Sequence, residues 1–328
     1  MTTHTTAADP RDRALRFQAT HDTLLAEVER AIKGKTTAIR LALACVFGGG
    51  HLLIEDVPGT GKTSLAKALA TGVSGSWHRI QFTPDLLPGD ITGVSIWDER
   101  ERDFRFRGGP VFANVVLADE INRAGPKTQS ALLEVMEEAQ VTVDGVAHPV
   151  PDPFLVVATQ NPIDLDGTYK LPEAQLDRFL MRISLGHPDL EDETAILINR
   201  ASAAPPESRP VTTLEEVAWM RRTVTGIHTA PEIARYVALL ARATREHPHL
   251  RLGLSTRGSL ALLRAAQAYA LGHGRHFVVP DDVRAVAGPV VAHRLVLTAQ
   301  AQVRGATPAA VLGEVLGSVP APTQAVPA

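Results

Sequence analysis

A glycine-rich loop that ends in lysine and threonine is the feature of this sequence that most clearly predicts chemistry. The loop lies between an apolar run at residues 52–54 and a helix-like segment at 64–70. It consists of Pro58, Gly59, Thr60, Gly61, Lys62, Thr63 and Ser64. A buried strand, a glycine turn and a helix N-terminus form a cradle in which backbone N–H groups and the helix dipole face an anion. Lys62 adds positive charge and the Thr63 hydroxyl can ligate Mg²⁺, so we predict that this loop binds nucleotide phosphates.

The loop departs from the full phosphate-loop pattern at Asp56. The pattern has a glycine at this position, ahead of Gly61 and Lys62. Aspartate is one of the few non-glycine residues that tolerate left-handed backbone angles, so we expect the turn to form. A carboxylate close to the loop does not favour the binding of an anion, and the sequence leaves the size of this effect open.

Two acidic residues follow a second apolar run. Asp119 and Glu120 come directly after residues 115–118, which are predicted to be a buried strand. Asp119 can hold Mg²⁺ through water, and Glu120 can orient and polarise a water molecule that attacks a phosphate. A phosphate-loop kinase needs no such glutamate beside its metal-binding aspartate. The pair therefore favours hydrolysis of the nucleotide, and we expect Thr63 and Asp119 to be the metal-binding residues.

A third polar group, Asn161, follows the apolar run at residues 155–158. An amide just past a buried strand can reach the γ-phosphate or the attacking water from between the two groups described above. On spacing alone, an ordinary turn residue before Pro162 is the better interpretation.

The apolar runs that precede these polar groups indicate a parallel sheet. Strands are predicted at residues 52–54, 79–82, 115–118 and 155–158. Helical patterns separate several of them, and this alternation implies an α/β fold that binds its ligand at the carboxyl ends of the strands. Two insertions interrupt the alternation. One covers about residues 85–107 and includes an alternating strand at 103–107, and the other, 140–150, is a hairpin pattern with Asp144 and Gly145 at its turn.

The character of the sequence changes past Pro188. Patterns rich in alanine, leucine and arginine predict helices at residues 190–202, 214–224, 231–246, 256–271, 280–295 and 308–316. We therefore expect an α/β domain at residues 15–188 and a separate helical domain at 189–302. Residues 1–14 are expected to be disordered, and residues 303–328 to hold a short helix and a Pro/Ala-rich tail.

Composition excludes several classes of protein. The chain has 328 residues, enough for two domains with cores, and a net charge of −3 that argues against a general electrostatic grip on nucleic acid. Its one cysteine, Cys45, lies among apolar residues and allows neither an intrachain disulfide nor a cysteine metal site. No apolar run is long enough to span a bilayer, and the polar N-terminus lacks the apolar stretch of a secretory signal. We expect a cytoplasmic protein without membrane insertion and without a nucleic-acid partner.

Several blocks of the sequence together resemble the signature of the MoxR family of AAA+ ATPases. In the first part of the chain these blocks are residues 55–59, 81–88, 108–112, 119–124, 159–162 and 171–179. In the helical part they are residues 253–257, 274–275, 279–283 and 293–295. The resemblance runs from about residue 32 to residue 316 and also covers Asp56. It implies an AAA+ phosphate-loop core with a parallel sheet flanked by helices, followed by a C-terminal all-helical lid domain.

The resemblance also implies roles for residues that spacing does not assign. It makes Asn161 the sensor-1 residue, Arg257 the sensor-2 residue, and Arg178 the arginine finger that contacts the γ-phosphate in a neighbouring subunit. Guanidinium groups match the charge that develops on phosphoryl oxygens, which makes these assignments chemically reasonable. Arg182 is the main competitor of Arg178. With Glu120, these residues form the expected catalytic set for ATP, with Mg²⁺ as the second cofactor.

A function follows from the same resemblance. It implies an ATPase that converts ATP and water to ADP and phosphate in a ring, with a hexamer as the expected assembly. The energy would drive chaperone-like remodelling, maturation or activation of a client protein complex, with a partner that carries a von Willebrand factor A domain. Both insertions are expected to face the pore or one end of the ring. The sequence has no aromatic–apolar–glycine pore loop, which argues against processive threading of a polypeptide.

The sequence leaves two other functions open. The first is a DNA-directed AAA+ motor or loader, which the acidic charge balance and the lack of a basic and aromatic groove disfavour. The second is a nucleotide-dependent scaffold with little hydrolysis, which the presence of Glu120 disfavours.

Overall fold

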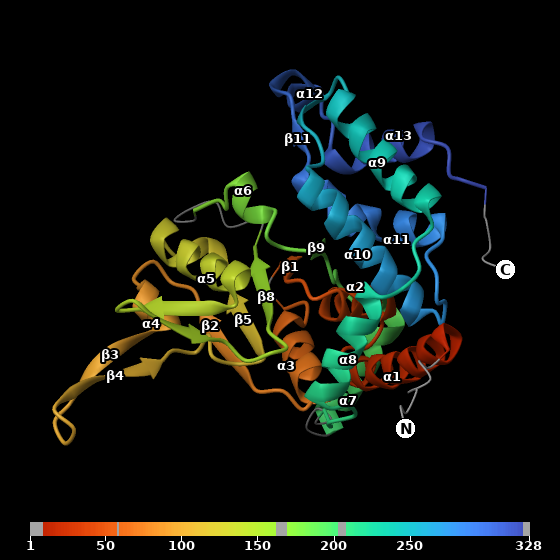
Figure 1. The fold of residues 1–328 in the computed structure, drawn as a ribbon. Helices are drawn as coiled ribbons and strands as arrows, with labels where there is room; N and C mark the ends of the chain where they lie inside the picture. The colour runs from red at the N-terminus through yellow and green to blue at the C-terminus, as the bar shows by residue number, and fades with distance from the viewer. Residues whose placement is uncertain (1–8, 58, 162–168, 203–207, 324–328) are drawn as a thin grey trace, which may run out of the picture. The chain divides into compact units, whose positions relative to one another are not determined.

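The computed structural model of the chain describes residues 9–57, 59–161, 169–202 and 208–323 (Figure 1). By its internal contacts the chain divides into two compact units. One unit spans Leu24–Ala218, and the other combines Met1–Thr23 with Trp219–Ala328.

A five-stranded parallel sheet forms the centre of the Leu24–Ala218 unit. The strands are β1 (Leu52–Glu55), β2 (Trp77–Gln81), β5 (Val115–Asp119), β8 (Leu155–Gln160) and β9 (Met181–Ile183). Their order in the sheet is β2-β5-β8-β1-β9, and every neighbouring pair is parallel. The predicted α/β class and its four strands are confirmed. The short edge strand β9 was not predicted, because three residues that include Arg182 give no recognisable apolar run.

Helices accompany this sheet, as the alternation of patterns predicted (Figure 1). They are α2 (Thr36–Phe47), α3 (Lys62–Gly72), α4 (Pro88–Thr92), the 3-10 turn η1 (Ile121–Arg123), α5 (Pro126–Glu138), α6 (Glu173–Leu176) and α7 (Leu190–Ser202). Val116 and Val156 from the sheet belong to the same buried cluster as Leu132 and Leu133 of α5. Cys45 is free and buried in α2, as its apolar surroundings predicted.

The two insertions are both antiparallel hairpins. β3 (Gly93–Asp98) pairs with β4 (Asp103–Gly108), and β6 (Gln140–Val143) pairs with β7 (Val146–Pro149). The predicted Asp-Gly turn of the second hairpin is confirmed, since Asp144 and Gly145 have positive φ angles of 51° and 80°. In the first insertion the sequence predicted only the strand at 103–107, whereas β3 is its partner.

The two hairpins contact each other. The Ser95 hydroxyl donates to a carboxylate oxygen of Asp144 over 2.6 Å, and the Phe106 ring stacks on the His148 ring with centroids 3.9 Å apart. Nearer the turn of the first hairpin, Trp97 and Phe104 face each other across the strands with ring centroids 5.2 Å apart.

The second unit is mainly helical. It contains α9 (Pro231–Glu246), α10 (Thr256–Gly272), α11 (Pro280–Val291), the 3-10 turn η2 (Ala292–Arg294), α12 (Ala299–Val303) and α13 (Pro308–Ser318). Two short strands, β10 (Leu250–Leu252) and β11 (Val296–Leu297), pair antiparallel and were not predicted. Ala265 and Ala266 of α10 are buried together with Val283 and Val286 of α11, and small side chains on α10 allow close helix packing.

Two helices each contain residues of both units. These are α1 (Pro10–Ala31) and α8 (Leu214–Thr225). The expectation of disorder at residues 1–14 is wrong from Pro10 onward. Proline is favoured in the first turn of a helix, Asp12 complements the helix dipole there, and Ala14 and Phe17 are buried. Residues 1–8, and the part of the predicted tail at 324–328, lie outside the described residues.

Candidate functional site

The phosphate loop follows β1 and leads directly into α3. Gly59 and Gly61 have φ angles of 89° and 91°, a left-handed conformation that favours glycine at both positions. Gly61 is the N-cap of α3, and Lys62 and Thr63 are the first residues of that helix. Pro58 lies outside the described residues. The predicted loop therefore has the backbone geometry of a turn that directs the N–H groups of a helix N-terminus toward a ligand.

Lys62 folds back over the loop that it terminates. Its ammonium group donates to the carbonyl oxygens of Asp56 and Val57, each over 2.8 Å. The Thr60 hydroxyl donates to the Val57 carbonyl over 3.3 Å. The loop is therefore held by its own polar groups, with the lysine cation at its centre.

Asp56 does not have the backbone conformation that would explain a glycine at its position. Asp56 is not one of the described residues that have a positive φ angle. The tolerance of aspartate for left-handed angles is therefore not what allows this turn. Its side chain is buried, and both carboxylate oxygens accept hydrogen bonds from residues that follow β9.

The acid pair lies at the end of β5, where the chain makes a sharp turn. Asp119 is the last residue of the strand, and Glu120 adopts φ 56° and ψ 49°, the left-handed region that costs a non-glycine residue free energy. Strain of this kind is often kept at functional sites because it fixes the direction of a side chain. The structure thus brings both predicted acids to one strand terminus.

A hydroxyl group on the neighbouring strand organises both acids. Thr159 of β8 is fully buried, and its hydroxyl donates to the Oδ1 atom of Asp119 over 2.5 Å. The Thr159 hydroxyl oxygen also accepts the backbone N–H of Glu120 over 2.9 Å. Thr159 belongs to the sequence block 159–162, but sequence reasoning assigned it no role.

Cationic and amide side chains contact one further oxygen of each acid. Arg79 of β2 donates to Asp119 Oδ2 from Nη2 over 2.6 Å and from Nε over 3.1 Å. Gln81 of β2 and Arg123 of η1 donate to Glu120 Oε2 over 3.0 Å and 2.9 Å. These three partners were not predicted. The position of β2 beside β5 identifies Arg79 and Gln81, because it places residues 79–81 opposite 117–119. Arg123 lies three residues after Glu120 in the chain.

The strand register places the loop and the acids at the same edge of the sheet. β8 lies between β1 and β5, with Ala158 opposite both Leu53 and Ala118. Glu55 at the end of β1 pairs with Gln160 at the end of β8, and Asn161 follows, buried. The carboxyl ends of β1, β5 and β8 therefore carry the loop, the acid pair and the predicted sensor amide side by side.

The two arginines that compete for the finger role lie in different local settings. Arg182 is part of β9, and its Nη1 atom lies 3.0 Å from a carboxylate oxygen of Glu55, at the end of β1. Arg178 precedes β9, and its Nε atom lies 3.1 Å from a carboxylate oxygen of Glu137 on α5. Arg182 is thus tied to the strand that carries the phosphate loop of its own chain.

The remaining predicted residue, Arg257, belongs to the other unit. It lies exposed in the first turn of α10, whose N-cap Ser255 accepts the Gly258 N–H over 3.0 Å.

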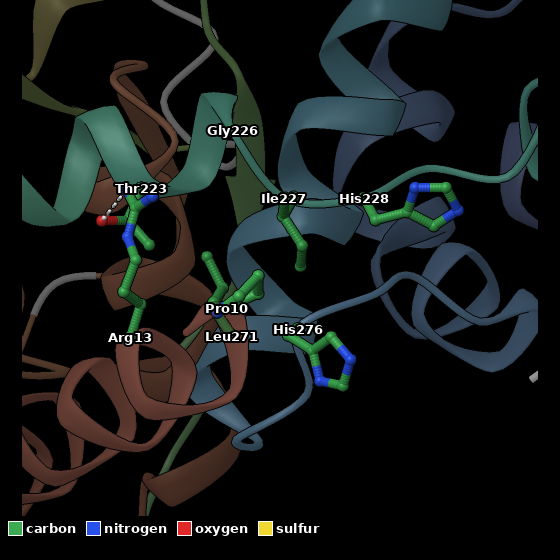
Figure 2. Close-up of a pocket in the computed structure, with 8 residues that line it drawn as sticks. All are labelled: Pro10, Arg13, Thr223, Gly226, Ile227, His228, Leu271 and His276. Atoms are coloured by element: carbon green, nitrogen blue, oxygen red, sulfur yellow. Dashed lines mark hydrogen bonds between the residues drawn. The ribbon is translucent and has the colours of Figure 1, made fainter. Parts of the chain in front are cut away.

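A separate pocket of about 240 Å³ lies within the mainly helical unit. Figure 2 shows the side chains of Pro10, Ile227 and Leu271 pointing toward one another, whereas the rings of His228 and His276 point away from them. None of the predicted nucleotide-binding residues is among those that line this pocket.

His247, His249 and Glu314 also lie together in this unit. Both ring nitrogens of His247 already have partners there, because Nδ1 accepts the His249 N–H and Nε2 faces a Glu314 oxygen, each over 3.2 Å. This is the geometry of a hydrogen-bonded turn.

Within the described ranges, no helix is long and apolar enough to cross a membrane.

Comparison with known proteins agrees with this architecture. Residues 51–181 match the family described as "ATPase family associated with various cellular activities (AAA)", and residues 242–315 match the family described as "AAA lid domain". A crystal structure of a protein from Cytophaga hutchinsonii superposes with a TM-score of 0.88 at 35% identity, covering 95% of this chain and 98% of that one. Together the matches define a class of protein, an AAA ATPase core with an AAA lid domain.

Curated relatives are similar along most of the chain. The uncharacterized protein YeaC of Bacillus subtilis is 46% identical over 90% of this chain and 93% of its own length. Chaperone MoxR1 of Mycobacterium tuberculosis is 42% identical over 92% and 82%, and protein MoxR of Paracoccus denitrificans is 33% identical over 83% and 87%. The chain belongs to the MoxR family of AAA+ ATPases, as the sequence blocks predicted.

The backbone at Glu120 generates a prediction about stability. Glycine adopts the left-handed conformation without the penalty of a Cβ atom, so Glu120→Gly is expected to be more stable than Glu120→Ala by ~1 kcal/mol. Chemical denaturation of the two variants measures the difference. At Glu134, an exposed position inside α5, the same pair of substitutions should show the opposite order, because glycine disfavours a helix interior. An alanine variant at position 120 as stable as the glycine variant would contradict this account.

Proposed function

We propose that this chain is a Mg²⁺-dependent ATPase whose hydrolysis cycle drives chaperone-like remodelling, maturation or activation of a client protein complex. The observation that carries the proposal is the arrangement at one sheet edge. There the Lys62 loop and the acid pair Asp119–Glu120 flank β8, in a chain of the AAA+ ATPase family.

The residues present fit a nucleotide with its metal ion. Among the described residues, and apart from the chain neighbours of Gly59, no heavy atom would lie within 4 Å of a Cβ atom at this position, so the loop backbone there is open to the approach of a phosphate. The Thr63 hydroxyl and the Asp119 carboxylate are hard oxygen ligands of the kind that Mg²⁺ prefers. When bound, the metal ion supplies charge stabilisation to the phosphate oxygens.

In this proposal each residue has one task. Residues 58–64 and the Lys62 ammonium hold the phosphates, while Thr63 and Asp119 hold the metal ion. Glu120 accepts a proton from the attacking water and orients it for in-line attack, and Asn161 and Arg257 contact the nucleotide of their own subunit. Thr159 positions the two acids relative to each other, since its hydroxyl donates to the Asp119 carboxylate and accepts the backbone N–H of Glu120.

Substitution of Glu120 tests the hydrolytic part. Glu120→Gln keeps the shape of the side chain but removes the base, so ATP hydrolysis is expected to fall by ~10²-fold or more while ATP binding persists. Steady-state ATPase assays and equilibrium binding measure the two quantities. Glu138→Gln, which neutralises an exposed carboxylate at the end of α5, is the matched control. Equal rates for wild type and Glu120→Gln would favour a scaffold over an enzyme.

We infer that the site is completed by a second subunit in a ring, with a hexamer as the expected assembly. AAA+ proteins typically oligomerise, and Arg178 is proposed to contact the γ-phosphate of the neighbouring subunit. Arg178→Ala is expected to keep ATP binding and to lose hydrolysis by about 10³-fold. Mixing it with Lys62→Ala subunits should restore part of the activity, because some shared sites then contain both groups.

Arg182→Ala provides the comparison for this complementation. It removes the ion pair with Glu55, at the end of the strand that precedes the loop. Each arginine variant is mixed with Lys62→Ala subunits. If the mixture with Arg178→Ala stays inactive and the mixture with Arg182→Ala gains activity, Arg182 is the arginine finger. Inactivity of both mixtures, while every variant still assembles, would contradict a shared site.

The hairpin β3–β4 supports contact with a client protein. Trp97 and Phe104 are 53% and 66% exposed although they form an edge-to-face pair. Exposed aromatic residues that lie together are typical of surfaces that bind other proteins. A relative that bears the name chaperone MoxR1 agrees with such a role.

Capture on the nucleotide-locked protein tests the partner. With Mg·ATP, immobilised Glu120→Gln protein is expected to retain a protein with a von Willebrand factor A domain together with a client complex, identified by mass spectrometry. Lys62→Ala, which lacks the phosphate-binding cation, is the control and should retain neither. Identical sets on both variants would argue against nucleotide-dependent remodelling.

A further inference from the structure

Asp56 takes the position of the first glycine of the phosphate-loop pattern, yet it makes contacts that glycine cannot make. Its Oδ1 atom accepts the Ser184 hydroxyl over 3.1 Å. Its Oδ2 atom accepts the backbone N–H groups of Leu185 and Gly186, the latter over 3.0 Å. The residue is only 8% exposed, so these bonds form largely away from water.

The donors belong to a backbone turn that suits an anion. Leu185 and Gly186 are consecutive, and Gly186 has a positive φ angle of 62°. Successive N–H groups around a left-handed residue converge on one acceptor and form an anion-binding concavity. The turn follows β9, which is an edge strand paired with β1 in the part of the chain that the structure describes. The N–H groups of the turn lie past the end of this pairing. The Asp56 carboxylate therefore satisfies amides that strand pairing does not reach.

The backbone of Asp56 is tied on its other sides as well. Its N–H donates to the carbonyl oxygen of Gln160 over 3.1 Å, one residue before Asn161. Its carbonyl oxygen accepts the Lys62 ammonium over 2.8 Å. One residue thus joins the end of β8, the exit of β9 and the cation of the phosphate loop.

We propose that Asp56 is a positioning residue that holds the phosphate loop in its binding conformation, so that the loop is already ordered before the nucleotide binds. This inference rests on the proposed ATPase function. A loop that is already ordered loses less conformational freedom when it binds a ligand, which strengthens binding more than it changes the chemical step. The carboxylate, which sequence reasoning regarded as unfavourable for phosphate, is taken up by the 184–186 turn.

This proposal predicts that restoring the consensus glycine weakens the site. Asp56→Gly creates the complete phosphate-loop pattern but leaves Ser184, Leu185 and Gly186 without their acceptor and makes the loop more flexible. The dissociation constant and the KM for Mg·ATP are expected to rise at least ~10-fold, with kcat within about 3-fold of wild type. Asp56→Asn retains one acceptor oxygen and Ser184→Ala removes one of the bonds, so both should give smaller increases in KM.

A matched control variant shows whether weaker binding of Mg·ATP comes from the loss of loop positioning or from a general loss of stability. Glu27 of α1 lies in the same unit, is 7% exposed, and its carboxylate accepts the backbone N–H of Arg209 over 2.8 Å and Arg30 Nη1 over 2.9 Å. Glu27→Gln removes a comparable buried carboxylate elsewhere. It is expected to lower the Tm while leaving the dissociation constant and KM for Mg·ATP unchanged.

The experiment measures equilibrium binding of Mg·ATP and steady-state ATPase rates for the wild type and these variants. Asp56→Gly that binds as tightly as wild type, or that changes kcat without KM, would overturn the inference while the ATPase function stands. If Asp56→Gly fails to fold, Asp56→Asn and Ser184→Ala decide, and an unchanged KM in both would overturn it. A wild type that does not bind Mg·ATP would overturn the proposed function and this inference with it.

Discussion

Parallel pairing of β1 and β5 on the two sides of β8 is the constraint on which the rest of this structure depends. β5 and β8 are buried along nearly their whole length, so polar side chains are tolerated only where the strands end. Because the strands are parallel, these ends meet at one edge. The phosphate loop, the acid pair and Asn161 are neighbours for this reason, although they are far apart in the chain.

The acid pair is held by a polar network built from three elements. Two adjacent carboxylates repel each other, and the guanidinium groups of Arg79 and Arg123 offset that repulsion. Both arginine side chains are 47% exposed, so each ion pair contributes modestly to stability and can be exchanged for other partners. The buried Thr159 hydroxyl is different, because its bonds form away from solvent and fix the acids relative to β8.

Sequence reasoning predicted most of the sheet and the glycine turn between β1 and α3, because apolar runs and glycine patterns are local signals. It identified Asp119 and Glu120 from their place after such a run. It did not find Arg79, Gln81 or Thr159, since their contacts follow from the strand order, which the linear sequence does not contain.

Asp56 shows a different limit. The pattern drew attention to a residue type at one position, and backbone tolerance was the natural explanation for it. Its contacts with residues 184–186 are long-range, and only the fold reveals them. The prediction of disorder was wrong at residues 10–14 for a different reason. Their polar composition concealed the first turn of α1.

The contacts between the two inserted hairpins have a mechanical consequence. The hydrogen bond from Ser95 to Asp144 and the stacking of Phe106 on His148 fasten the projecting strands β3 and β4 to β6 and β7 (Figure 1). A force that pulls on Trp97 and Phe104 of the first hairpin would therefore act on both hairpins together. Along the chain, the tension would pass from β4 into β5 and from β7 into β8, the strands that end at the acids and just before Asn161. It would also pass into α4, which precedes β3, and into α5, which precedes β6.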